Sequence, residues 1–135
     1  LPHLASTERS TDLRTEWCGI EDAEKLIFWD GAAEASRRQF LAGGQLVLIA
    51  SADHWLGVGR QYLAREGLGR VTEAAEVDGH GGVRLRLAAA FHPALVVGRL
   101  LGCWERAEGR PGRATWTANA RGHDIILQSR REIAE

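Results

Sequence analysis

The sequence has no methionine, one lysine, two cysteines and three prolines, and no apolar run reaches the length of about 18 residues that a transmembrane helix needs. A net charge of -1 provides no overall attraction for nucleic acid or for an anionic membrane surface. Cys18 and Cys103 form no zinc-finger or redox spacing, so we expect two buried, reduced thiols, with one disulfide as the alternative. These absences predict a cytoplasmic protein with neither nucleic-acid nor membrane partners.

Arginine almost completely replaces lysine, because 16 of the 17 basic residues are arginine and only Lys25 is lysine. Arginine codons are rich in GC, so this bias indicates a high-GC bacterial genome. The charge is also uneven: residues 1–83 carry 8 basic and 13 acidic side chains, whereas residues 84–135 carry 9 and 5. We interpret this as two complementary solvated surfaces; the alternative is a basic sheet face that meets an anionic ligand.

The chain has 135 residues, of which 44% are hydrophobic and 26% charged, the balance of an ordinary globular domain. A chain of this length forms one core without the help of a disulfide or a metal. We therefore predict a single domain over residues 1–135, with residues 1–15 as an extended lead-in.

One string inside this domain is similar to a targeting signal. Residues 36–41 read SRRQFL, which resembles the twin-arginine export signal, and an apolar stretch follows up to Ala50-Ser51-Ala52. Residues 1–35 contain Trp17, Trp29 and eight carboxylates, unlike a basic leader. We interpret the string as a helix end that runs into a strand, with export as the alternative.

The first half of the chain shows mainly the spacing of three to four residues that is typical of helices. We expect Asp30-Gly31 to break this pattern, and Gly43-Gly44 and Gly67 to end helices. The apolar run from residue 45 to 50 fits a buried strand, after which Ser51 is positioned to cap a helix. The predicted elements are helices over 20–29, 32–42 and 52–66 and a strand over 45–50.

In the second half the apolar residues recur at every second position, the period of a half-buried strand. Trp116 alternates in phase with Ala114, which predicts a place for Trp116 on the core face of its strand. Residues 94–107 are ambiguous, because Pro93 can open a helix whereas Gly98 and Gly102 weaken one, and we predict a strand there. The predicted strands are 70–77, 83–87, 94–107, 113–120 and 124–130, with a hairpin loop over 78–82.

Helices followed by consecutive strands define the α+β class. We predict N-terminal helices packed on a curved antiparallel sheet of five to six strands. This order of elements resembles that of the nuclear-transport-factor-2-like superfamily, in which helices close a pocket over a conical sheet. The resemblance extends to element order and length alone, and it implies a ligand pocket.

The chemistry-bearing motifs of common enzymes are absent: there is no nucleophile elbow, Walker loop, zinc-protease helix or dinucleotide fingerprint, and we expect no cofactor. Asp53 and His54 open a predicted helix, and a carboxylate beside an imidazole can fix the tautomer that a general base needs. The alternative is a polar first helical turn, in which adjacent side chains point about 100° apart. Four loop residues carry side chains that can bind a metal, namely Asp78, His80, His123 and Asp124. Their spacing matches no known ligand signature, so no metal site is expected.

Two functional hypotheses follow. The first is a pocket protein that binds a small apolar or aromatic molecule, with Asp53 and His54 transferring a proton in an isomerase-, lyase- or cyclase-type reaction. Its expected ligand contacts are aromatic side chains and two arginines that orient an anionic group, namely Trp55, Tyr62, Trp116, Arg86 and Arg99. The second is a non-enzymatic interaction or assembly module, in which an aromatic and Arg-rich sheet face forms a homodimer or partner interface.

Overall fold

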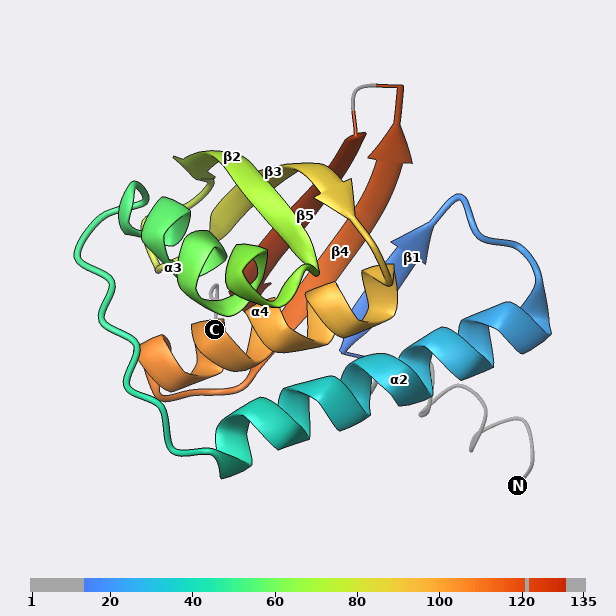
Figure 1. Cartoon of the computed structure of the whole chain (residues 1–135), viewed down its shortest axis with the longest axis horizontal. Coiled ribbons are helices and arrows are strands. Elements are labelled where there is room, and N and C mark those ends of the chain that lie inside the picture. The colour runs from blue at the N-terminus through green and yellow to red at the C-terminus, as the bar shows by residue number, and fades with distance from the viewer. Residues whose placement is uncertain (1–13, 121, 131–135) are drawn as a thin grey trace.

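The computed structural model describes residues 14–120 and 122–130 and has an α+β architecture (Figure 1). As the sequence predicted, the chain combines helices with one sheet, but the helices are not all N-terminal. The elements are β1 Thr15–Cys18, α2 Ala23–Ala42, α3 His54–Tyr62, a 3-10 turn η1 Ala64–Glu66, β2 Gly69–Glu76, β3 Val83–Ala90, α4 Pro93–Glu108, β4 Gly112–Asn119 and β5 Gly122–Ser129. No helix among these is long and apolar enough to cross a membrane.

The five strands form an open, mixed sheet in the order β1-β4-β5-β3-β2. The pairs β2–β3, β3–β5 and β4–β5 are antiparallel, whereas β1 runs parallel to β4 and places Trp17 beside Trp116. The prediction of a purely antiparallel sheet was therefore wrong. A parallel pair needs a long crossover connection, and here the chain between β1 and β4 contains three helices and a hairpin.

The prediction of a strand over residues 94–107 was also wrong, because Pro93–Glu108 forms α4. Pro93 occupies the first turn, where its missing N–H costs nothing. Gly98 and Gly102 do not weaken this helix: they let it approach α2 closely. A Cβ atom on Gly98 would lie 2.1 Å from the carbonyl oxygen of Ala33, and one on Gly102 would lie 3.1 Å from the ring of Phe40.

Two corrections concern the N-terminal part of the chain. Asp30-Gly31 does not break a helix, since α2 is continuous over 20 residues. The carboxylate of Asp30 instead accepts a hydrogen bond from the indole Nε1 of Trp17 at 2.6 Å. β1 was missed, because residues 1–15 were predicted to be an extended lead-in and no element was predicted for residues 16–18. Residues 1–13 of that lead-in lie outside the described residues.

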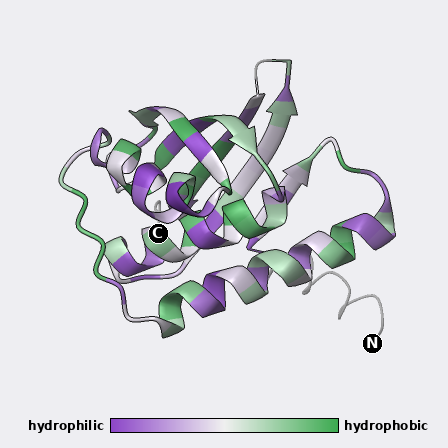
Figure 2. Cartoon of the chain, in the orientation of Figure 1, coloured by the Kyte–Doolittle hydropathy of each residue, from purple (hydrophilic) through white to green (hydrophobic). Residues whose placement is uncertain are grey.

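The predicted buried strand over residues 45–50 is an extended connection that joins no sheet. Val47 is buried in the core, but Leu46 and Leu48 are 74% and 75% exposed. Figure 2 shows this hydrophobic connection on the outside of the molecule, between α2 and α3. An apolar run of this length is typical of a buried strand, but here only one side of the segment meets the core, so half of the run faces solvent.

The core lies between the helices and one face of the sheet. The predicted alternation is confirmed for β3 and β4, because Leu85 and Leu87 are fully buried and Trp116 is only 4% exposed. Trp17, Trp29 and Trp116 form a cluster at the edge of this core, with ring centroids 5.1 to 5.9 Å apart. No helix of the described residues packs against the opposite face of the sheet, which carries alternating residues such as Arg84 and Thr115.

Candidate functional site

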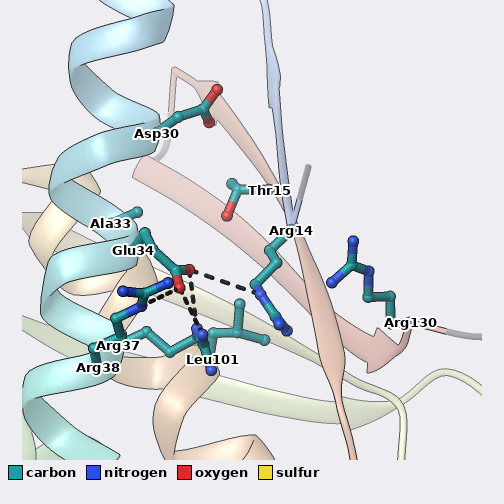
Figure 3. A pocket seen from close by; sticks show the side chains of 9 residues that line it. All are labelled: Arg14, Thr15, Asp30, Ala33, Glu34, Arg37, Arg38, Leu101 and Arg130. Carbon is teal, nitrogen blue, oxygen red and sulfur yellow. Dashed lines mark hydrogen bonds and ion pairs between the residues drawn. The ribbon is translucent and has the colours of Figure 1, made fainter. Parts of the chain in front are cut away.

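A pocket of about 560 Å³ opens between α2, β1 and the end of β5, with α4 as its floor. Four arginines converge on it from two ends of the described chain and from α2 (Figure 3). We call it the arginine pocket, and its lining residues are Arg14, Thr15, Asp30, Ala33, Glu34, Arg37, Arg38, Leu101 and Arg130.

The secondary structure explains why these residues meet. On α2, residues spaced by three, four or seven positions share one face, which brings Asp30, Glu34 and Arg37 into line. Arg14 precedes β1, and its carbonyl oxygen accepts a hydrogen bond from Ala114 of β4 at 2.6 Å. Arg130 follows β5, the other neighbour of β4. Pairing on both sides of β4 therefore brings Arg14 and Arg130 to the same end of the sheet.

Glu34 is the central carboxylate of the pocket. Arg37 donates to it twice, from Nη2 at 2.6 Å and from Nε at 3.1 Å, and Arg38 donates from Nε at 2.8 Å. The Nε of Arg14 lies 3.7 Å away. These partners, of which Arg37 has the largest effect, lower the pKa of Glu34 to about 2, so its carboxylate is charged at neutral pH.

Glu105 of α4 is buried beneath the pocket and ties three elements together. It accepts from Nη1 of Arg37 at 2.6 Å, from Nη1 of Arg14 at 2.9 Å and from the backbone N–H of Gly112 at 2.7 Å. Arg37 is buried as well, and its hydrogen bond to Glu34 raises its pKa above the usual arginine value. Arg37 thus joins α2 to α4 through Glu105, while Glu34 holds its guanidinium in place on α2.

Among the described residues, the pocket brings guanidinium groups close to one another as well as to carboxylates. The pKa of Arg14 is lowered, by burial first and then by the charge of Arg37, with a further contribution from Arg130. Glu105 and Glu34 oppose this shift but do not cancel it. A cation whose pKa is lowered by neighbouring cations would gain from an added anion.

The predicted catalytic pair lies elsewhere, in an open groove of about 330 Å³ beside α3, and Tyr62 lines the same groove. Asp53 and His54 are both exposed, and no hydrogen bond joins their side chains. The Nδ1 of His54 accepts from the backbone N–H of Ala50 at 2.9 Å, so a neutral His54 carries its proton on Nε2.

The other predicted contacts are not brought together with this pair. Trp55 is a core residue at 2% exposure, and Trp116 packs on Trp17 and Trp29. Arg99 donates to the carbonyl oxygen of Tyr62 and to the carboxylate of Glu66. Arg86 pairs with Asp124 on the uncovered sheet face. None of the four residues discussed in this paragraph lines the groove of Asp53 and His54; they are Trp55, Trp116, Arg99 and Arg86.

The uncovered sheet face bears on the interaction-module hypothesis. Arg84, Arg86 and Arg113 lie on this face, which agrees with its predicted arginine content. Among the described residues, the strands carry two tryptophans, Trp17 and Trp116, and both side chains are buried on the helix-covered side of the sheet. The face is therefore Arg-rich but not aromatic.

A third hollow, the apolar groove, has a volume of about 570 Å³ and lies between the first half of α2 and the start of α4. Phe28 and Phe91 flank it at 72% and 63% exposure, and Trp29, Pro93 and Leu95 also line it. His92, at the N-cap of α4, has a φ of 110°, which is a strained conformation for a residue with a side chain.

Sequence reasoning missed the arginine pocket, although part of its signal was visible. Glu34, Arg37 and Arg38 have the i, i+3 and i, i+4 spacing of a helical ion-pair cluster. The pairing of Arg37 with Glu105 spans 68 residues and has no local signature. Asp78, one of the loop residues weighed as a metal ligand, accepts from the backbone N–H groups of His80 and Gly82 instead.

Within the described part of the chain, no group of three or more metal-ligating side chains comes together. Comparison of the chain with protein-family models, with curated proteins and with solved structures found no match.

Proposed function

We propose that the protein binds a small molecule through an anionic group, a carboxylate or a phosphate, in the arginine pocket. The observation that carries this proposal is the convergence of Arg14, Arg37, Arg38 and Arg130 on one hollow. Guanidinium groups are the preferred partners of carboxylates and phosphates, because their planar N–H forks match two oxygens at once.

Two of the arginines have donors to spare. Each guanidinium offers five N–H groups, but toward the described residues Arg14 donates side-chain hydrogen bonds only from Nη1 and Arg38 only from Nε. Beyond Glu34 and Glu105, no described residue pairs with either side chain. The remaining N–H groups of Arg14 and Arg38 are therefore the donors that we assign to the ligand, while Arg37 holds the floor in place.

The proposal keeps the idea, expected from the sequence, that the protein binds a small molecule. It differs in the site, which is the arginine pocket, and in the ligand, which is anionic. The arginine pocket shares no lining residue with the groove of Asp53 and His54. Proton transfer by that pair stays a prediction, to be tested separately.

Isothermal titration calorimetry with acetate and with inorganic phosphate tests anion binding. A charge-assisted hydrogen bond is worth about 1.5–3 kcal/mol, so Arg14→Gln or Arg38→Gln should weaken binding roughly 10- to 100-fold. Arg113→Gln, on the uncovered sheet face, is the matched control and should bind as the wild type does. Absence of binding at millimolar anion, or equal weakening by Arg113→Gln, would refute the proposal.

The apolar groove supports a second candidate function, the binding of an uncharged aromatic molecule, which is the ligand class expected from the sequence. The groove presents aromatic ring faces and aliphatic carbon to solvent, from Phe28, Trp29, Phe91 and Leu95. Exposure of such apolar surface to water is unfavourable in free energy. A flat apolar molecule inserted between the two helices would cover them.

Equilibrium dialysis with naphthalene tests this candidate. Phe91→Ser should reduce binding about tenfold, because a buried Phe side chain contributes about 1.5–3 kcal/mol. Leu46→Ser removes an equally exposed apolar side chain outside the groove and should change nothing. Unchanged binding by Phe91→Ser would exclude the groove as the site.

A further inference from the structure

The arginine pocket is polarised along its length. Asp30 lies at one end, next to Thr15 and away from the arginine side chains, which gather at the other end (Figure 3). The rise of 1.5 Å per residue separates Asp30 from Arg37 by about 10 Å along the axis of α2. The two ends of the pocket thus present opposite charges to whatever lies between them.

Among the residues that the structure describes, Asp30 has only a neutral partner. Its Oδ1 accepts from the indole Nε1 of Trp17 at 2.6 Å, and no described basic side chain forms a salt bridge with it. Burial raises the pKa of Asp30, as expected for a carboxylate that loses water without gaining a cation. Every other carboxylate at this site, Glu34 and Glu105, is paired with at least two arginines.

We propose that the ligand is a zwitterion, a short amino acid or peptide whose ammonium group pairs with Asp30 while its carboxylate is held by Arg14 and Arg38. This inference rests on the proposed function, because the arginines bind the anionic end. The ammonium group supplies the cation that Asp30 lacks, and Thr15 adds a hydroxyl at the same end. A simple anion would satisfy only half of the pocket.

The separation of the two ends selects linear amino acids as probes. Part of the distance of about 10 Å is spanned by the side chain of Arg38, because long side chains on a helix point back toward its N-terminus. The probes are therefore 5-aminovalerate and 6-aminohexanoate, each compared with valerate or hexanoate, the same carboxylate without the amine. Calorimetry should show that the wild-type protein binds each amino acid at least tenfold more tightly than its matched carboxylate.

Asp30→Asn is the decisive variant, because the amide oxygen still accepts from Trp17 while the charge is removed. This variant should bind the amino acids and the carboxylates equally, with carboxylate affinity no weaker than that of the wild type, because removal of a negative charge does not disfavour an anion. Glu73→Gln, an exposed position on β2, is the control for loss of one negative charge and should keep the tenfold preference.

The outcomes separate this inference from the proposed function. If valerate binds as tightly as 5-aminovalerate to the wild-type protein, the zwitterion is overturned and anion binding stands. If neither probe binds, both fail. If folded Asp30→Asn loses valerate as well, Asp30 shapes the pocket without contacting an ammonium group, and the zwitterion is again overturned.

Discussion

The close contact between α2 and α4 gives the sharpest stability prediction. Gly98→Ala would place a Cβ atom 2.1 Å from the carbonyl oxygen of Ala33 and 2.8 Å from the Cβ of Ser36. Both atoms belong to or adjoin the backbone of α2, so no side-chain rotation can relieve the clash, and the two helices must separate.

The size of the effect is the difference between two terms. Overpacking a tight interface costs about 1–3 kcal/mol, and a backbone contact belongs at the upper end of that range. Replacing glycine by alanine inside a helix returns about 1 kcal/mol. Gly98→Ala should therefore lower the free energy of unfolding by about 2 kcal/mol.

Two matched variants separate sterics from helix propensity in urea denaturation. Gly31→Ala in α2 has nothing within 4 Å of the added Cβ, so it should raise the free energy of unfolding by about 0.5–1 kcal/mol. In Gly102→Ala the nearest atoms to the added Cβ belong to the side chain of Phe40 and the carbonyl oxygen of Arg37, at 3.1 to 3.3 Å, so this variant should fall between the two. A Gly98→Ala protein as stable as Gly31→Ala would refute the close approach of the helices.

Four further predictions concern single side chains. Glu105→Ala should cost about 3–5 kcal/mol in urea denaturation, because it leaves the guanidinium of Arg37 buried with half of its partners. Trp116→Ala should cost a similar 3–5 kcal/mol, and a loss below about 1 kcal/mol would remove it from the core. The pKa of Glu34 falls from 4.5 to about 2 on folding, so the charged carboxylate contributes its full stabilisation above pH 4.5 and loses it as the pH falls toward 2. Glu34→Gln should therefore flatten the acid-denaturation curve between these two pH values. His54→Ala should leave the melting temperature nearly unchanged, since the ring is exposed, and any loss of turnover or ligand binding in that variant would support the predicted proton-transfer role.

The sequence predicted those elements whose pattern is decided locally. β3 and β4 alternate because one face of each strand is buried, and Gly67 ends its helical segment in the left-handed conformation, with a φ of 73°. α4 was missed because Gly98 and Gly102 were judged by their low helix propensity alone. Their role is to let α4 approach α2 closely. β1 has four residues and pairs with a strand almost 100 positions away, so no local period predicts it.

The candidate site shows the same division between local and distant information. Asp53 and His54 are adjacent in sequence and were easy to nominate, but adjacency did not produce a hydrogen bond between them. Arg14, Arg37 and Arg130 meet because strand order and helix packing bring them together. Such a site is set by topology, which a single sequence does not reveal.

The tryptophan cluster has a spectroscopic consequence. Indole rings with centroids 5.1 to 5.9 Å apart have coupled electronic transitions, so Trp17, Trp29 and Trp116 should give an exciton signal that changes when one of the three is replaced and is lost when two are replaced. The hydrogen bond from Trp17 to Asp30 ties this chromophore to the end of the arginine pocket. A ligand that changes the charge balance at Asp30 would therefore shift the signal, and the protein carries an intrinsic optical reporter of its own pocket.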